Sequence, residues 1–210
     1  MTSYLPAQLS DGELPPPDQR GGGSLAGKRV RQPAPPAPGE LAQTMAEIEG
    51  PYYRVGAPER SELLEPGDEP GLIISGRVLN PAGKPIPNAV VNLWHCDTEG
   101  NYDMVGYQYH GFVRTDRDGR WQFTTILPAC YWPRLASHLH FKVQGVSRPL
   151  TTQLYLEGEP GAENDPYYAP SQVVHTTVDE HGVRHGTYDF VIAQVTEAEN
   201  VTKATLAARV

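Results

Sequence analysis

The fold of this chain is decided by residues 72–97, LIISGRVLNPAGKPIPNAVVNLWHCD. Two runs rich in apolar and β-branched residues lie at the ends of this stretch, LIISGRVLN and VVNLWHCD, and both are typical of strands. The prolines, glycine and asparagine of PAGKPIPNA between them are typical of a turn. Residues 72–97 therefore predict a strand, a turn and a second strand.

The same pattern continues along the rest of the chain. Helical periodicity is almost absent, apart from a short helical turn that we expect in GELAQTMAEIEG, residues 39–50. We therefore predict an all-β fold, a β-sandwich of eight or nine mostly antiparallel strands with long loops. The further strands are expected in GFVRTD (111–116), RWQFTTI (120–126), HLHFKVQG (138–145), TTQLYLEG (151–158), SQVVHTTVDEHG (171–182) and GTYDFVIAQV (186–195).

The N-terminal part of the chain has a different composition. Residues 1–40 contain eight prolines and six glycines. Such a segment cannot bury enough apolar surface to offset the entropy lost on ordering. We predict a disordered Pro/Gly-rich N-terminal arm over residues 1–45, a β-sandwich domain over 46–195 and a C-terminal extension over 196–210.

The overall composition excludes several classes of partner. A formal charge of -8 argues against nucleic acid and against an anionic membrane surface. No apolar run approaches the ~18 to 20 residues of a membrane-spanning helix, and the N-terminus lacks the apolar core of a secretory signal. Two cysteines are too few for a disulfide framework. We expect a cytoplasmic protein.

A candidate metal site lies in ACYWPRLASHLHFKV, residues 129–143. In a strand, His138 and His140 leave the same face while Leu139 and Phe141 leave the other. Two imidazoles one pleat apart can bind one ion. The alternative is a core strand whose histidines are buried without a ligand.

Two further pairs of residues could complete such a site. Cys96 and Cys130 would give a Cys₂His₂ zinc site, but structural zinc sites usually take their cysteines as closely spaced pairs. Tyr102 and Tyr131 would bind as phenolates, and a phenol with a pKa near ~10 needs a strong Lewis acid to ionise at neutral pH. Ferric iron is hard and highly charged, so two tyrosines with two histidines imply Fe(III).

Five segments of the chain together resemble the intradiol ring-cleavage dioxygenase family, of the protocatechuate 3,4-dioxygenase and catechol 1,2-dioxygenase type. They span about residues 49–193 and occur in the order found in the family. The resemblance implies a β-sandwich that holds a non-haem Fe(III) ion as cofactor. The segments are EGPYYRVGAPERSEL, GRVLNPAGKPIPNAVVNLWHCDTEGNYD, RTDRDGRWQFTTILPACY, HLHFKV and PLTTQLYLEGEP.

The resemblance also implies an activity. The protein would be an oxidoreductase of aromatic compound catabolism that takes a small aromatic diol and O₂ as its partners. It would cleave a catechol-type ring between the two hydroxyl-bearing carbons and insert both atoms of O₂, giving a muconate-type dicarboxylic acid. Members of the family commonly associate, so a homo-oligomer is expected.

Carried over by position, the resemblance implies roles for individual residues. The metal ligands would be Tyr102 (axial), Tyr131 (equatorial), His138 and His140. Tyr102 would also act as a base.

Other residues of the resemblance would form the pocket. Gln153 would lie beside the iron, Tyr52 and Tyr53 would line the substrate entrance, and Gln153 with Arg134 would stabilise anionic intermediates. The sequence departs from the family at one point. Leu135 stands where the family often has an arginine, three residues before the first histidine, and Arg134 lies one residue earlier.

Two other functions remain open at this point. The segment GRVLNPAGKPIPNAVV is shared with transthyretin-like β-sandwich modules that bind without catalysis. An iron oxygenase of secondary metabolism, acting on an unusual catechol, would keep the same ligands. Near the ligand loop, Tyr107, Tyr109 and His110 are interpreted as cross-strand aromatic packing, with a pocket role as the alternative.

Overall fold

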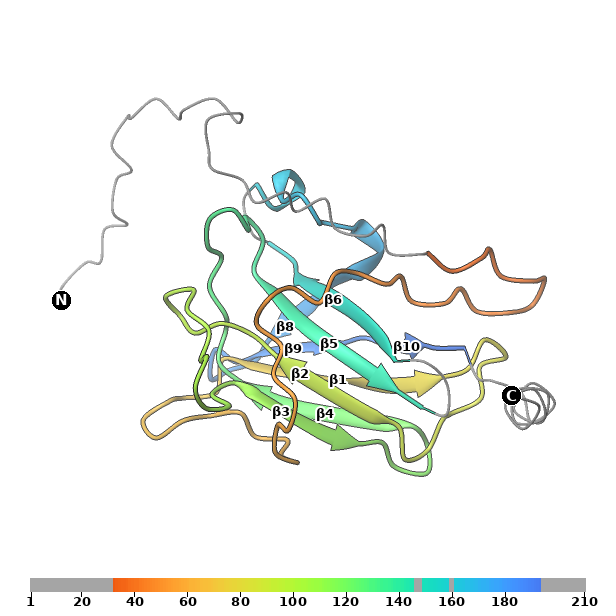
Figure 1. Ribbon diagram of the computed structural model, residues 1–210, viewed down its shortest axis with the longest axis horizontal. Helices are drawn as coiled ribbons and strands as arrows, with labels where there is room; N and C mark the ends of the chain where they lie inside the picture. The colour runs from red at the N-terminus through yellow and green to blue at the C-terminus, as the bar shows by residue number, and fades with distance from the viewer. Residues whose placement is uncertain (1–31, 146–148, 159–160, 194–210) are drawn as a thin grey trace, which may run out of the picture.

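The computed structural model describes residues 32–145, 149–158 and 161–193, and these form two five-stranded sheets (Figure 1). The architecture confirms the predicted all-β sandwich. No helix in these ranges is both long and apolar enough to cross a lipid bilayer. The strands are β1 (Leu72–Leu79), β2 (Val90–Trp94), β3 (His110–Arg114), β4 (Arg120–Thr125), β5 (His138–Gln144), β6 (Leu150–Leu156), β7 (Val173–Val174), β8 (Thr176–Val178), β9 (Arg184–Thr187) and β10 (Phe190–Val191).

The first sheet is built around β1. One edge of β1 pairs with β4 in the antiparallel direction, with Leu72 opposite Thr125. The other edge pairs in parallel with β9 and then β10, and β8 adds to β9 as an antiparallel hairpin.

The second sheet has the order β3-β2-β5-β6-β7. Its four main strands pair in the antiparallel direction, and only the short β7 is parallel to its neighbour. In this register Trp94 on β2 lies opposite His140 on β5, and His140 lies opposite Gln153 on β6. Because directly paired residues share a face of the sheet, the register places these three side chains in one row.

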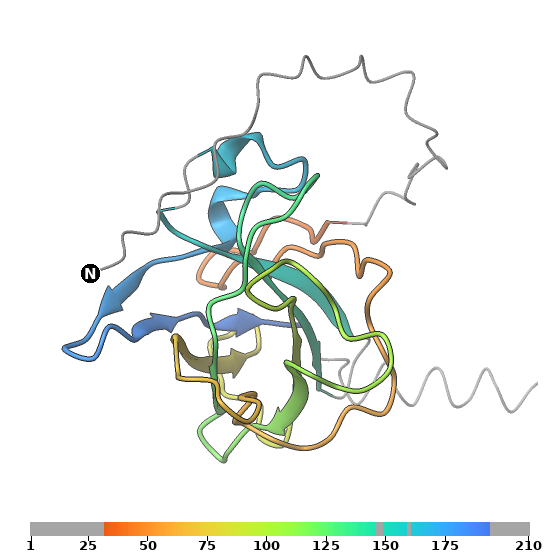
Figure 2. The ribbon, with the colours of Figure 1, turned by 90° about the vertical axis from the view of Figure 1, so that its left-hand side faces the viewer.

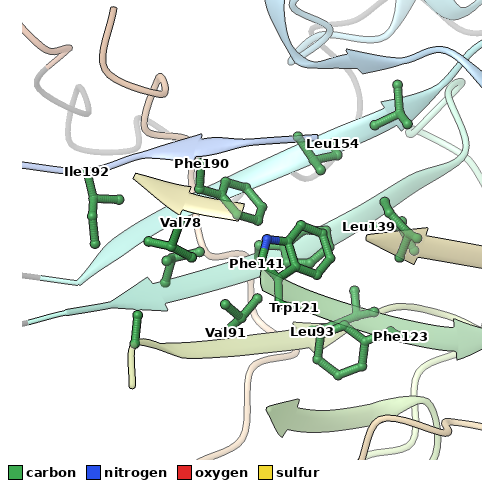
Figure 3. Close-up of a cluster of buried hydrophobic side chains, with 14 of the residues drawn as sticks. Val78, Val91, Leu93, Trp121, Phe123, Leu139, Phe141, Leu154, Phe190 and Ile192 are labelled. Atoms are coloured by element: carbon green, nitrogen blue, oxygen red, sulfur yellow. The ribbon is translucent and has the colours of Figure 1, made fainter. Parts of the chain in front are cut away.

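The hydrophobic core lies between the two sheets (Figure 3). Trp121 of β4, Phe141 of β5 and Phe190 of β10 form its aromatic centre, with ring centroids 5.0 to 5.5 Å apart. Leu139 and Phe141 are fully buried in this core. This confirms the prediction that they leave the opposite face of β5 from the two histidines.

Within the described residues the ten strands exceed the eight or nine predicted. The run 171–182 contains both β7 and β8, and the run 186–195 contains the end of β9 and all of β10. A turn at residues 179–183 separates β8 from β9, and the Asp179 carboxylate accepts hydrogen bonds from the backbone amides of His181 and Val183. Figure 2 shows this hairpin extending from the body of the sandwich. Between β9 and β10, the Asp189 carboxylate accepts the backbone N–H of Arg77, where an unbroken strand would pair through its backbone.

The helical turn predicted within residues 39–50 is wrong. Residues 41–53, here called the strap, contain no helix and run across the second sheet (Figure 1). The backbone N–H of Thr44 donates to Val191 and that of Glu47 donates to Thr151, both at 2.9 Å. A helix this short is marginal in water, so hydrogen bonds to the sandwich decide the conformation.

The strap and one further segment cover the outer face of the second sheet as a third layer. That segment contains two short 3₁₀ helices, η2 (Ala162–Asn164) and η3 (Pro170–Gln172). Most of the predicted N-terminal arm (residues 1–31) and the predicted C-terminal extension lie outside the described residues, so the proposed domain division stays a prediction. This third layer supplies part of the wall of the cavity described below.

The core predicts the response to truncation of Phe141. We expect Phe141→Ala to lower the free energy of unfolding by about 3–5 kcal/mol, as for other buried phenylalanines. Val178→Ala is the control, because Val178 is 63% exposed and surface substitutions usually stay within about 0.5 kcal/mol. Chemical denaturation of both variants measures the difference, and equal losses would contradict this description of the core.

Candidate active site

The two histidines of β5 lie on the outer face of the second sheet and are almost completely buried. The Nδ1–H of His138 donates to the backbone oxygen of Ala136 at 2.7 Å. Its Nε2 therefore carries the lone pair, and Nη1 of Arg134 donates to that atom at 2.9 Å. Burial first, and then the charge of Arg134, lower the pKa of His138 to about 4. At neutral pH this imidazole is uncharged and can act as a ligand.

His140 is held by aromatic packing. Its ring stacks on Trp94 with the centroids 5.0 Å apart, and its Nε2 lies 3.1 Å from the Tyr102 hydroxyl. Its Nδ1 is buried and has no hydrogen-bond partner among the described residues. Burial, with the neighbouring His138 and Arg134, holds the pKa of His140 well below 6.5. This imidazole is also neutral.

Tyr102 is presented by a tight turn after β2. The Asp97 carboxylate accepts two backbone N–H groups of this turn, each at 2.8 Å. Gly100 in the turn has φ +87°, and a Cβ at this position would lie 2.7 Å from the Cβ of Tyr131. A glycine is therefore required both by the backbone conformation and by the close approach of Tyr131. This close approach brings the two tyrosines together.

The two phenols face each other in the site. Their oxygens are 3.4 Å apart, and the ring of Tyr102 stacks on Tyr52 with the centroids 4.1 Å apart. Burial is the main cause that raises the pKa of each phenol, and proximity to Tyr131 raises that of Tyr102 further. Without a compensating cation both side chains are therefore neutral phenols.

The four predicted ligands thus come together in one place. Within the described ranges, no group of three or more His, Cys, Asp and Glu side chains could hold a metal. The Cys₂His₂ alternative is therefore wrong: Cys96 is buried and donates to the Ala129 carbonyl, and Cys130 is exposed. Two ionised phenols and two neutral imidazoles fit a hard, highly charged cation such as Fe(III) better than zinc.

A cavity of about 460 Å³ lies against these ligands. Its polar wall includes Tyr131, Arg134, His140 and Gln153, and the remaining wall is apolar or aromatic. The strap supplies one side of the cavity, and the loop before β5 supplies another. The apolar and aromatic lining residues are Ile48, Gly50, Pro51, Tyr52, Pro133 and Tyr167.

Of the two tyrosines expected at the substrate entrance, only Tyr52 lines the cavity. The ring of Tyr53 packs on Trp94 at 4.8 Å, and the Lys142 ammonium lies 3.8 Å above its face. The strap thus directs the ring of Tyr52 to the cavity and the ring of Tyr53 to the sheet.

Arg134 reaches the site although the sequence places it one residue before the expected position. Its Nε donates to Asp165 at 3.0 Å and its Nη2 donates to the Gln153 side-chain oxygen at 2.8 Å. Gln153 in turn donates from Nε2 to the backbone oxygen of Ile48 in the strap. Leu135 is 40% exposed.

Asp165 is a site residue that the sequence analysis missed. Besides Arg134, its carboxylate accepts the backbone N–H groups of Leu135 at 2.8 Å and Tyr167 at 3.0 Å. Burial alone would raise the pKa of Asp165, but these donors outweigh it and the pKa lies below 3.8. The sequence AENDPYY around Asp165 looks like an ordinary turn, and no local signal connects it with residue 134.

Tyr107, Tyr109 and His110 do not line the cavity. The Tyr107 hydroxyl donates to the Val55 carbonyl, and the Tyr109 hydroxyl donates to the Asp68 carboxylate. His110 contacts an asparagine side chain of β2. Their contacts support the packing interpretation.

Asp165→Ala should lower the free energy of unfolding by about 3–5 kcal/mol, because it leaves the buried Arg134 charge without its partner. A carboxyl with a lowered folded pKa stabilises above its unfolded pKa and loses this effect as the pH falls through the folded pKa. The difference from wild type should therefore shrink in acid. The control is Asp118→Ala, which breaks an exposed pair with Arg120 and should change stability by less than about 1 kcal/mol. Thermal and denaturant unfolding at several pH values measure the loss of stability in each variant. An equal loss for Asp165→Ala and Asp118→Ala would contradict the proposed role of the buried pair.

Comparison with known proteins agrees with this geometry. A family model described as "Dioxygenase" matches residues 48–200. Catechol 1,2-dioxygenase 2 of Acinetobacter lwoffii is 31% identical over 67% of this chain and 61% of its own length. Chlorocatechol 1,2-dioxygenase of Pseudomonas putida is 33% identical over 75% of this chain and 71% of its own length. The chain spans about six tenths or less of the first catechol dioxygenases it matches.

Solved structures give the same result. The dioxygenase domain of a dioxygenase–carbohydrate-binding fusion from Streptomyces sp. SirexAA-E superimposes with a TM-score of 0.68 at 36% identity, over 73% of this chain and 99% of that domain. The 3-chlorocatechol 1,2-dioxygenase of Rhodococcus opacus 1CP gives 0.67 at 28% identity, over 72% and 73%. With the family model matching well over half of its residues, this chain belongs to the intradiol ring-cleavage dioxygenase family.

Proposed function

We propose that this protein is a non-haem Fe(III) dioxygenase that cleaves an aromatic ortho-diol between its two hydroxyl-bearing carbons. Both atoms of O₂ enter the product, which is a muconate-type dicarboxylic acid. The observation that carries the proposal is the convergence of Tyr102, Tyr131, His138 and His140. Two of the four, Tyr131 and His140, line a cavity large enough for an aromatic ring.

These four side chains would hold the iron. When bound, Fe(III) supplies a Lewis acid that acidifies the diol and draws electron density from its ring. The Ala136 carbonyl fixes the tautomer of His138, so Nε2 keeps its lone pair for a metal, as the outer partners of metal-bound histidines usually do. The positive charge of the metal would compensate two phenolates that burial otherwise disfavours.

Tyr102 is the candidate base. Its oxygen lies 3.1 Å from Nε2 of His140 and 3.4 Å from the Tyr131 oxygen. Once ionised by the metal, it would be suited to accept a proton from a hydroxyl of the incoming diol. Stacking on Tyr52 fixes the plane of its ring. Tyr131 completes the pair of phenols that faces the diol.

Arg134 and Gln153 are candidates for stabilising negative charge. Nε2 of His138 has a single lone pair, so a metal at this atom would release Nη1 of Arg134 to donate elsewhere. Asp165 and Gln153 hold the rest of the guanidinium in place. The released N–H could then donate to an anionic oxygen of the substrate at no cost in reorganisation.

The site favours this function over the alternative of a transthyretin-like binding module. That alternative accounts for the strand–turn–strand motif, but it gives no role to two partly buried phenols beside two neutral imidazoles. An iron oxygenase of secondary metabolism would use the same ligands and would differ in the diol that enters the cavity.

Iron-loaded wild type should be red to brown from phenolate-to-Fe(III) charge transfer, and it should consume O₂ with catechols. Tyr102→Phe should weaken Fe(III) binding by at least about 10²-fold, since even partners outside the ligand shell are worth roughly 10–100-fold. Its visible band should change and its turnover should be largely lost. Metal analysis, absorption spectra and O₂ uptake with mass spectrometry of the product measure these effects.

The matched control is Tyr107→Phe, which removes a nearby tyrosine hydroxyl that donates to the Val55 carbonyl. It should keep iron, colour and turnover. A colourless protein with stoichiometric zinc would contradict the proposed cofactor. Unchanged iron content and spectrum in Tyr102→Phe would show that Tyr102 is not a ligand.

A second prediction concerns the approach of the two tyrosines. Gly100→Ala and Gly158→Ala each place a side chain at a positive φ, +87° and +88°, and each should cost roughly 1 kcal/mol of stability. Only the methyl group at position 100 meets Tyr131, because nothing lies within 4 Å of a Cβ at position 158. We therefore expect only Gly100→Ala to lower Fe(III) affinity and to shift the visible band. If titration gives the same Fe(III) affinity for the two variants, this role of Gly100 is contradicted.

A further inference from the structure

We propose that the diol this cavity accepts carries a bulky, uncharged, apolar or aromatic ring substituent, and that ring carboxylates are excluded. The inference rests on the proposed function and specifies its substrate class. It follows from the size of the cavity, the chemistry of its wall and the neutralisation of its charged residues.

The cavity is much larger than one aromatic ring requires. Its volume is about 460 Å³, whereas an apolar cavity of roughly 150 Å³ is enough to bind benzene. A simple catechol at the four ligands would leave most of the space unfilled. The volume falls within the range of about 300–1,000 Å³ that is usual for larger small-molecule ligands. There is room for a second ring or a short alkyl chain.

The wall that would surround such a substituent is apolar. Ile48 and Pro51 of the strap, Pro133 of the loop before β5 and Tyr167 supply aliphatic and aromatic surface. The polar side chains of the wall are Tyr131, His140, Arg134 and Gln153, and the two aromatic rings of Tyr52 and Tyr167 each add one hydroxyl. The two hydroxyl groups of the diol would bind on the side of Tyr131 and His140. Beyond the diol, the wall offers burial of apolar surface, which is favourable for an apolar group.

The charges at the cavity leave no free cation for a carboxylate. Arg134 is the ionised basic side chain among the lining residues, and the Asp165 carboxylate neutralises it within the protein. Glu47 of the strap is a second carboxyl that interacts with Arg134. Lys142 is not a lining residue of the cavity. It pairs with Glu49 and lies over the face of the Tyr53 ring. The proposed iron and the N–H of Arg134 would be taken by the two diol oxygens. A carboxylate elsewhere on the ring would therefore lose its hydration without gaining an opposite charge, which is strongly unfavourable.

The test uses two pairs of diols and iron-loaded wild-type protein. Methyl 3,4-dihydroxybenzoate and 3,4-dihydroxybenzoate have nearly the same shape and differ by one charge. We expect the ester to bind at least about 10²-fold more tightly, from the cost of burying an unpaired charge. We expect 4-phenylcatechol to bind at least about 10-fold more tightly than catechol, from burial of its second ring. Anaerobic calorimetric titration gives the dissociation constants, and kcat/KM gives the corresponding ratios in turnover.

A variant tests the charge argument within the same cavity. Ile48→Arg places a cation in the apolar wall and should reduce the preference for the ester by at least about 10-fold. Ile48→Met is the matched control, because it keeps an uncharged side chain of similar volume, and it should leave the preference unchanged.

The outcomes separate this inference from the proposed function. The inference is overturned if the acid binds as tightly as the ester or more tightly, even if the protein cleaves both. It is also overturned if catechol binds as tightly as 4-phenylcatechol or more tightly. If the ester binds more tightly than the acid but the protein cleaves none of the four diols, the inference is supported and the proposed function is overturned. Failure of the iron-loaded protein to bind any of the four diols overturns both.

Discussion

The site depends on the alternation of side chains along β5. Leu139 and Phe141 are fixed in the core between the two sheets, so His138 and His140 must leave the opposite face at a set position. A shift of register by one residue would move the imidazoles into the core and the apolar side chains into the cavity. The packing of Phe141 therefore also fixes the ligands. Because β5 carries both core residues and ligands, a core substitution on β5 should also change the positions of the two imidazoles.

A second constraint is the buried ion pair between Arg134 and Asp165. Removing two charges from water is costly unless further hydrogen bonds satisfy them, and here nearly every donor of the guanidinium has a partner in the site. The same carboxylate holds the backbone of Leu135 and Tyr167. It thereby ties the loop before β5 to the segment that closes the cavity. This explains how an arginine one residue away from the usual family position still reaches the first histidine.

The cavity is made by segments outside the sheets, and these determine what could enter it. The strap contributes Ile48 and Tyr52, and the loop before β5 contributes Pro133. Loops on a rigid scaffold commonly carry such selectivity, because their sequences can change without disturbing the core. The sheets hold the imidazoles, and the third layer sets the size, polarity and charge of the space in front of them.

The sequence by itself predicted the strands and the sandwich, and it placed His138 and His140 on one face, because these features depend on period-2 alternation and on turn residues. The resemblance of five segments to the dioxygenase family then implied the four candidate ligands. Only the tertiary structure decided that residues 41–53 form a strap and not a helical turn, because their hydrogen-bond partners lie on β6 and β10, far away in the sequence. It also decided that Tyr53 turns away from the cavity and that Asp165 neutralises Arg134. These are contacts between distant segments, and no local pattern of residues encodes which distant side chain will complete a buried charge.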